Sequence, residues 1–457
     1  MLERLFKLRE RGVTVRIEVL GGATTFLTMA YIVVVNPAVL SAIGIPVGPS
    51  TVATIVVAIF GTLLMGLYAN RPIAVAPYMG ENAFIAFTLA ALGIPWTIAL
   101  GAVFVSGLLF LVITLLRIRP WLAAAISPSM KRSFAAGIGL FLALIGLYES
   151  GIVASFVTGM PAAALAEPGS GLLRAPAAPL KIGALSDPKV LLAVFGFLLI
   201  ALLIQRGVRG AILIGMVATA GAGWLLGYGQ APRAFAALPF TGAYDLSGLA
   251  FKLDLAGVLQ VGMLPVLLTL FLMGFLDTLG TLVAVGAAGG MLDARGDLPE
   301  IQKPMLVDAL SCVFAGLVGT STSGAYIESA TGIREGARTG LASVTTAALF
   351  AVSLFLIPLF EPLQSLRYAY APALVAVGLL MLSSIRQIDF DDMTELIPAF
   401  ATIAMMVFTY NIANGLTAGL ALYPLVKAAA GRWREVTPGA CVLALLCATY
   451  YVFGLPH

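Results

Sequence analysis

Two stretches organise this chain: FLMGFLDTLGTL (Phe271–Leu282) and GTSTSGAYIESATG (Gly319–Gly332). Each places one carboxylate, Asp277 or Glu328, inside an otherwise apolar segment that is rich in small residues. A charge at membrane depth is costly, so it usually faces a cavity and serves a function. The second stretch is too rich in Gly, Ser and Thr for a simple spanning helix. Broken helices that line a midplane site are typical of transporters.

The composition is that of a membrane protein. Of the 457 residues, 60% are hydrophobic and 11% are charged, and the mean hydropathy is +1.02. A soluble domain carries about 25% charged residues. The basic N-terminus precedes a long apolar run without a cleavage site, so we expect that run to stay as a span. The sequence therefore predicts an all-α polytopic protein of the cell membrane.

Cysteine and histidine usage argues against several kinds of site. Cys312, Cys441 and Cys447 lie in apolar segments and make neither a disulfide framework nor a metal cluster, so we expect small buried side chains. The only histidine, His457, is the last residue, which argues against a zinc site and a histidine proton relay. The Gly-rich segment GIREGARTG lacks the Lys-Ser/Thr pair of a P-loop. We expect no metal, no cofactor and no nucleic-acid partner.

Apolar runs of about 20 residues mark the candidate spans. The chain has two sets of seven and one extra C-terminal hydrophobic run, at 437–454. An odd number of spans per half gives the two halves opposite orientations, as in transporters with inverted repeats. The first set is 17–40, 49–68, 72–91, 95–116, 132–151, 189–205 and 208–227. The second set is 256–285, 303–318, 320–334, 338–360, 368–386, 393–410 and 412–428.

Positive charge fits this topology when the N-terminus is cytoplasmic. Lys and Arg concentrate in the loops that the assignment places inside the cell, as the positive-inside rule expects. The loop 152–188 lies outside, and the run 437–454 points outward or lies in the interface. Of the 26 Lys and Arg residues, those assigned to the outside are Arg174, Lys181, Lys189, Arg233, Lys252 and Arg367.

The third span of each half opens with residues that disfavour a helix. Pro72 and Pro77 open span 3, and Gly319 and Gly324 open span 10. We expect a short extended segment in each, followed by a half-helix, which in span 10 begins near Ala325. Backbone without helical hydrogen bonds is tolerated at this depth only where protein or a wet cavity satisfies it.

Two acids are the main candidates for the site. We expect Asp277 to bind a polar substrate or to take a proton; the alternative is a structural bond to a neighbouring helix. At Glu328, the free N–H groups of the half-helix and hydroxyls such as that of Ser323 would surround the carboxylate. This set suits a flat heterocycle with N–H donors and C=O acceptors better than a bare anion.

Further polar and aromatic candidates lie in the third span. Asn82 can donate to and accept from the edge of a base, or it can tie the break together. Glu81 either faces the site or pairs with Arg71. Phe84 could stack on a planar ring, although aromatic residues at helical spacing more often pack in a core. Asp308 is a fourth intramembrane acid and is expected to support the site.

At these residues the chain resembles the nucleobase–cation symporter superfamily of uracil, xanthine and purine permeases. Within it, the chain is most similar to the AzgA-like guanine/hypoxanthine/adenine permeases. The matching stretches run in family order through both halves: Gly21–Leu40, Met79–Thr88, Phe275–Val285, Gly319–Leu341 and Ile397–Leu416.

The resemblance implies a fold of fourteen spans in two inverted sevens. A core domain would comprise spans 1–4 (residues 1–131) and spans 8–11 (residues 256–360). A gate domain would comprise spans 5–7 (residues 132–255) together with spans 12–14 and the C-terminal helix (residues 361–457). The core would hold the substrate between the two broken spans, and the gate would move against it.

The resemblance also implies the activity. A purine nucleobase, namely guanine, hypoxanthine or adenine, would be imported by proton symport through the lipid bilayer. The family's binding positions match Asp277, Glu328 and Asn82, and the coupling proton would be carried by Asp277 or Glu328. A homodimer is left open, and the protein is expected not to be an enzyme.

This chain departs from the family's pattern at two positions. The family usually has an aspartate at the position of Gly274 and a leucine at the position of Glu81. The chain therefore lacks one of the family's acids, at Gly274, and has an additional acid, Glu81, near the same cavity. The identity of the purine is left open. The main alternative is a transporter of an oxyanion or carboxylate on the same fold. The others are a channel and an intramembrane aspartyl protease using Asp277 and Asp308, for which no catalytic motif is present.

Overall fold

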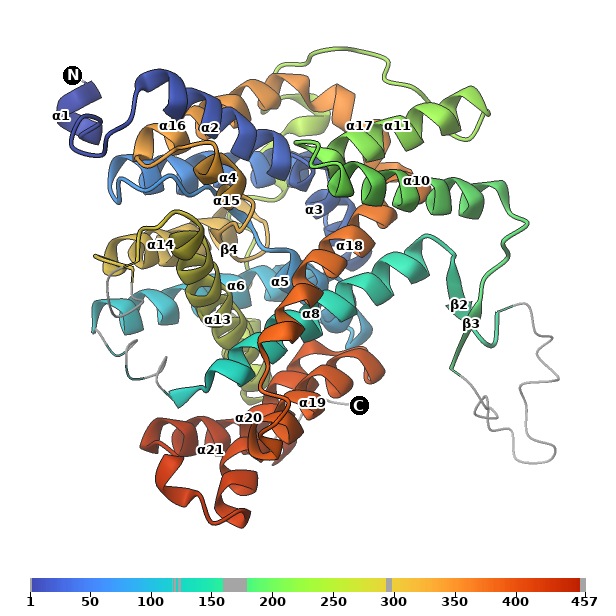
Figure 1. The fold of residues 1–457 in the computed structure, drawn as a ribbon. Coiled ribbons are helices and arrows are strands. Elements are labelled where there is room, and N and C mark those ends of the chain that lie inside the picture. Colours follow the sequence, from blue (N-terminus) through green and yellow to red (C-terminus); the bar gives the residue numbers. More distant parts are fainter. Residues whose placement is uncertain are drawn as a thin grey trace, which may run out of the picture.

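The computed structural model describes residues 2–116, 118, 121, 125–158, 179–292 and 298–452. Much of the predicted outside loop 152–188, including Arg174, lies outside the described residues, as does His457. Helices make up most of the chain, and Figure 1 shows them running past one another in many orientations.

The helices follow the predicted spans closely at most positions. The first half contains α1 (Leu2–Phe6), α2 (Val15–Met29), α3 (Ile32–Leu40), α4 (Val47–Leu67), α5 (Met79–Ala83), α6 (Trp96–Leu115), α8 (Pro128–Glu149), α10 (Pro188–Gln205) and α11 (Ala211–Leu225). The second half contains α12 (Leu255–Val258), α13 (Leu264–Ala288), α14 (Gln302–Val318), α15 (Ser329–Arg334), α16 (Gly340–Ser353), α17 (Ile357–Ser365), α18 (Arg367–Leu382), α19 (Met393–Phe408), α20 (Ile412–Ala429) and α21 (Pro438–Val452). Four short strands are β1 (Val75–Pro77), β2 (Val153–Ser155), β3 (Leu180–Ile182) and β4 (Ser323–Ala325).

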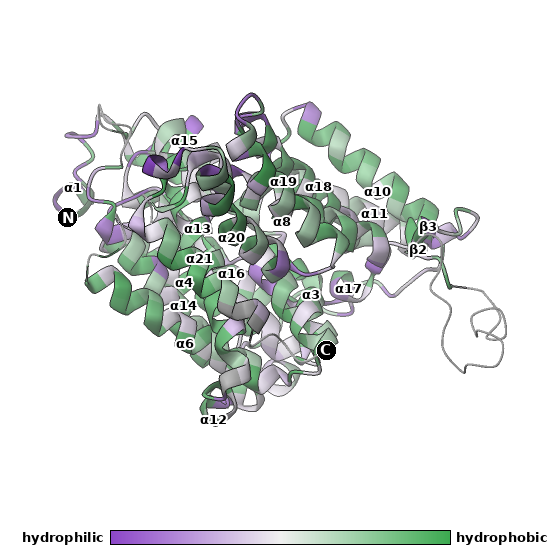
Figure 2. Ribbon diagram, turned by 90° about the horizontal axis from the view of Figure 1, so that it is seen from below, coloured by the Kyte–Doolittle hydropathy of each residue, from purple (hydrophilic) through white to green (hydrophobic). Residues whose placement is uncertain are grey.

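The helices have the length and composition of membrane spans. Within the described ranges, eight helices are long and apolar enough to cross a membrane, and α11 and α19 are shorter apolar helices. A helix satisfies its own backbone hydrogen bonds, which is what a segment in lipid requires. Figure 2 shows hydrophobic residues along the helix bodies and hydrophilic residues mainly at helix ends and loops. The protein is therefore a multi-pass membrane protein.

The first predicted span, 17–40, is interrupted. It consists of α2 and α3, joined by a turn at Ala30 and Tyr31. Inside α3, Pro37 has no N–H, so the carbonyl of Val33 lacks its usual donor. The side chain of Gln364 supplies one, with its Nε2 2.9 Å from that oxygen. A second-half residue therefore completes a first-half helix.

Two groups of helices pack among themselves. In one group, α4 packs against α3, α14 and α16, while α6 packs against α13 and α14. In the other group, α8 packs against α18 and α19, and α10 packs against α11 and α18. Small residues allow the closest approaches, as is common in membrane helix pairs. At the crossing of α8 and α18, a Cβ on Gly139 would lie 2.7 Å from the carbonyl oxygen of Gly378.

The cysteines differ in their surroundings. Cys312 and Cys447 are buried, as expected. The expectation was wrong for Cys441, which is exposed on α21. This terminal helix packs mainly against α20, so only part of its surface is covered.

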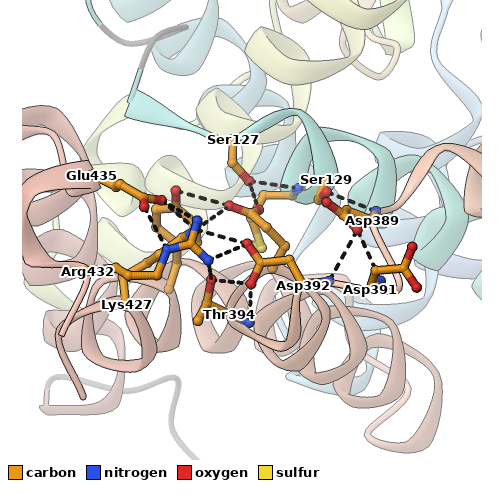
Figure 3. Close-up of polar contacts among 12 residues, drawn as sticks. Ser127, Ser129, Asp389, Asp391, Asp392, Thr394, Lys427, Arg432 and Glu435 are labelled. Carbon is orange, nitrogen blue, oxygen red and sulfur yellow. Dashed lines mark hydrogen bonds and ion pairs between the residues drawn. The ribbon is translucent and has the colours of Figure 1, made fainter. Parts of the chain in front are cut away.

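Charged residues join the ends of α8, α19 and α20 in what we call the Lys427 cluster (Asp392, Glu395, Lys427, Arg432 and Glu435), drawn in Figure 3. Lys427 is 1% exposed, and its Nζ lies 3.0 Å from carboxylate oxygens of both Glu395 and Glu435. Arg432 contacts Asp392 at 2.7 Å and Glu435 at 2.6 Å. The Thr394 hydroxyl and Arg432 hold the pKa of Asp392 well below its ordinary value. Ser127, the residue directly before α8, donates a hydrogen bond from its hydroxyl group to Glu395 at 2.5 Å.

We expect Lys427→Met to destabilise the folded protein by about 3 kcal/mol, because it leaves the mostly buried Glu395 without its cation. The comparison is Lys303→Met, which removes the exposed pair with Glu300 and should change stability by less than about 1 kcal/mol. Thermal unfolding of both purified variants measures the difference. Equal melting temperatures for the two variants would show that the Lys427 cluster contributes little to the stability of the folded protein.

Candidate functional site

The centre of the molecule contains two strands that come from opposite halves of the chain. β1 pairs with β4 in antiparallel register, with Val75 opposite Ala325 and Pro77 opposite Ser323. The backbone N–H of Tyr78 donates to the Thr322 carbonyl at 2.9 Å, which extends the pairing of the two strands. Backbone groups that no helix satisfies are thus paired with each other, which removes the cost of placing them at membrane depth.

Side chains hold this strand pair in place. Gly324 is required on β4 because a Cβ there would lie 2.1 Å from the hydroxyl oxygen of Tyr78. The Tyr78 hydroxyl lies 2.9 Å from the Thr278 hydroxyl of α13. Asp308 of α14 accepts a hydrogen bond from the backbone N–H of Ala325 at 3.0 Å. Asp308 therefore anchors β4.

The segments that follow the two strands differ. β1 leads into α5 and then a π-helix, η2 (Phe84–Leu89). After β4, the half-helix predicted to begin near Ala325 begins at Ser329 instead and is only six residues long. The expectation was wrong because Ser323–Ala325 pairs with β1. Glu328 is the residue directly before this helix.

Glu328 is held by a residue of the first span. The Tyr31 hydroxyl, at the turn between α2 and α3, donates to Glu328 Oε1 at 2.6 Å. Next to it, the Ser329 hydroxyl accepts from the backbone N–H of Ala74 at 3.0 Å. Tyr31 was not among the site residues predicted from the sequence. Its only sequence signal was a phenol within the matching stretch Gly21–Leu40.

Asn82 is tied to a second residue that sequence reasoning missed. Its Nδ2 donates to Asn36 Oδ1 at 2.9 Å, and Asn36 in turn donates to Thr54 at 2.7 Å and to Thr320 at 2.9 Å. Asn36 thus links α3, α4 and the segments around both strands. The Oδ1 of Asn82 is buried and has no hydrogen-bond partner among the described residues. An amide beside Pro37 in an apolar run was the signal available in the sequence.

Glu81 faces α13 and does not pair with Arg71. It is fully buried, and within the described part of the chain neither carboxylate oxygen has a hydrogen-bond partner. A Cβ built on Gly274 would lie 3.9 Å from Glu81 Oε1. Asp277 is three residues further along the same helix, on the same face, and is partly buried. Arg71 donates instead to the carbonyl of Pro299.

Two other candidates are engaged in packing. The Ser323 hydroxyl lies 2.8 Å from the Ser311 hydroxyl of α14, so its hydrogen bond is made to another residue of the protein. Phe84 is fully buried in the main hydrophobic core. Stacking of Phe84 on a ligand stays a prediction.

The chain matches the model of the Permease family (Xan_ur_permease) over residues 16–418. It belongs to this family. A permease of Methanocaldococcus jannaschii is 42% identical over 453 residues, covering 99% of this chain and 98% of the relative. The adenine permease AdeP of Escherichia coli K12 is 38% identical, covering 100% of this chain and 97% of the relative. The guanine/hypoxanthine permease PbuO of Bacillus subtilis 168 is 36% identical, covering 97% and 98%.

The permease also shares its fold with solved structures. The transmembrane domain of the cyanobacterial bicarbonate transporter BicA superposes with a TM-score of 0.60 at 17% identity. The match covers 89% of this chain and 97% of that domain. At this identity the likeness concerns the fold alone.

Proposed function

We propose that the protein carries a purine nucleobase into the cell by proton symport. The observation that carries this proposal is the pairing of β1 with β4, with Asn82 following one strand and Glu328 following the other. Relatives named as adenine and guanine/hypoxanthine permeases match over nearly the whole chain, which supports the substrate class. The N-terminus would be cytoplasmic and the membrane would be the cell membrane.

The proposed architecture has fourteen spans in two inverted sevens. Residues 1–131 and 256–360 would form the core, and residues 132–255 and 361–457 would form the gate. The two groups of mutually packed helices support this division. Movement of one group past the other would expose the site to each side in turn.

In the proposed site, each polar group has a distinct role. Glu328, oriented by Tyr31, would accept hydrogen bonds from ring N–H groups. Asn82, fixed through its Nδ2, would offer its Oδ1 to a donor on the base edge. Asp277 would bind the base or carry the coupling proton, and Glu81 would lie beside it. A neutral base suits this set, because three carboxylates near the breaks would repel an oxyanion.

We expect purified protein in proteoliposomes to accumulate labelled adenine, hypoxanthine or guanine when the outside is acidic. Unlabelled purines should compete, bicarbonate and sulfate should not, and a protonophore should abolish accumulation because it removes the driving force. Protein-free liposomes give the background. Competition by an oxyanion would favour the alternative transporter, and uptake that never exceeds equilibrium would favour a channel.

A further inference from the structure

A polar cavity lies beside the N-terminal segment, which contributes Arg11 to its wall. Its volume is about 460 Å³, and its walls include Arg11, Arg71, Arg338 and Glu300. Cavities of roughly 300–1,000 Å³ are the size that holds small ligands. The four side chains come from four separate segments, so the tertiary fold assembles the cavity.

Among the described residues that line this cavity, the charged side chains are predominantly positive. Glu300 is its one lining acid among the described residues, and that carboxylate pairs with Lys303 at 2.8 Å. Within the residues that the structure describes, no carboxylate lies within ion-pair distance of Arg11, Arg71 or Arg338. Burial and the nearby positive charge of Arg11 lower the pKa of Arg71 from its ordinary value, and Glu300 offsets only part of this shift. A bound anion would relieve this crowding of like charges.

Backbone carbonyls hold two of the three arginines, Arg71 and Arg338, in place. Arg71 is 4% exposed and donates to the Pro299 carbonyl. One terminal nitrogen of Arg338 donates to the carbonyls of Ile333 and Ala337, at 2.6 and 2.7 Å. A guanidinium has five N–H donors, so both side chains retain donors for a ligand.

A buried acid fixes the loop that carries Arg338. The carboxylate of Glu18 accepts backbone N–H groups from Arg338 at 2.8 Å, Thr339 at 3.1 Å and Ala342 at 3.2 Å. Its oxygens are thereby occupied by the backbone. This arrangement positions Arg338 before any ligand arrives, which lowers the entropy cost of binding.

We propose that this arginine cavity binds a phosphate group, carried either by a small cytoplasmic molecule or by a lipid headgroup. Planar guanidinium groups match the geometry of phosphate oxygens and can bind them in pairs. The cavity is larger than inorganic phosphate alone requires, which fits a phosphate ester. Arg71 lies just before β1 and Arg338 just after α15, so a bound phosphate would connect the N-terminal segment to the loops flanking both broken segments.

The first experiment measures binding of inorganic phosphate and of a nucleoside monophosphate to the purified full-length protein by calorimetry at constant ionic strength. We expect saturable binding that weakens about tenfold or more in Arg338→Gln and in Arg11→Gln, because each change removes a charge-assisted contact. The matched control is Arg9→Gln, an exposed residue of the same segment that does not line the cavity. Melting temperatures without ligand verify that each variant folds.

A second experiment separates the two sources of phosphate. The same proteins are placed in nanodiscs of phosphatidylcholine with or without phosphatidylglycerol, and their melting temperatures are compared. A stabilisation by phosphatidylglycerol that is lost in Arg338→Gln but kept in Arg9→Gln assigns the cavity to a lipid headgroup. Binding of the soluble phosphates assigns it to a small molecule. The proposal is overturned if neither source binds, or if both arginine variants bind like the unmodified protein; nucleobase uptake is not needed for either outcome.

Discussion

Glu328→Gln is expected to reduce proton-driven nucleobase accumulation by about 100-fold. The amide keeps the shape of the side chain but loses its charge, and the Tyr31 hydroxyl then faces a weaker acceptor. Hydrogen bonds to a charged group contribute about 1.5–3 kcal/mol each, so losing the charge that serves the substrate and Tyr31 gives a change of this size. Initial uptake rates in proteoliposomes with an acidic exterior measure the effect.

Two further variants test the physical account of Glu328. Tyr31→Phe removes one oriented contact and should reduce uptake less, by about tenfold. Glu335→Gln is the matched control, because Glu335 is an exposed acid seven residues later that pairs with Arg209. Its uptake should stay near that of the unmodified protein. Full proton-coupled accumulation by Glu328→Gln would contradict the proposed site.

The second large effect concerns Glu81 and the neighbouring Gly274 of α13. Glu81→Leu should reduce uptake about tenfold or more, and Gly274→Asp should do the same for a different reason. The Cβ of the new aspartate would lie 3.9 Å from Glu81 Oε1, so two carboxylates would crowd one buried space. The double variant moves the acid from α5 to α13 and should recover much of the lost uptake.

A double-mutant cycle measures this coupling. We expect an interaction free energy of at least about 1 kcal/mol, since residues in contact commonly couple by 0.5–3 kcal/mol. Gly280→Ala is the control on the same helix, because a Cβ at Gly280 meets no atom within 4 Å and should be tolerated. Effects of Glu81→Leu and Gly274→Asp that simply add would show that the two positions act independently. Uptake of adenine and of hypoxanthine should be compared, since moving the acid is expected to change which purine is preferred.

Hydrophobic runs predicted the helices well because lipid imposes one strong requirement on a spanning segment. The predicted run 95–116 is α6 (Trp96–Leu115), and 189–205 is α10 (Pro188–Gln205). Two interruptions were harder to predict. The turn at Ala30 and Tyr31 lies inside an unbroken apolar run, and the helix start at Ser329 depends on pairing with a strand about 250 residues away.

Several candidate site residues stood out in the sequence because an acid or an amide in an apolar segment is rare. Asp277, Glu328, Asn82 and Glu81 all carried that signal. Tyr31 and Asn36 carried little signal, because a single phenol or amide near a proline is compatible with ordinary packing. Ser323 looked available in the sequence, but its hydroxyl is taken by Ser311, which only proximity of α14 and β4 reveals.

Composition and the order of apolar runs were thus sufficient for a multi-pass helical protein, for the positions of most of its long helices and for the acids worth examining. Folding in three dimensions was required for everything that depends on distant partners. Tyr31 meets Glu328, Gly274 makes room beside Glu81, and three arginines from separate loops share one cavity. The physical reason is that burial in lipid acts on each segment separately, whereas hydrogen bonds and charge pairs form between segments that the chain order does not bring together.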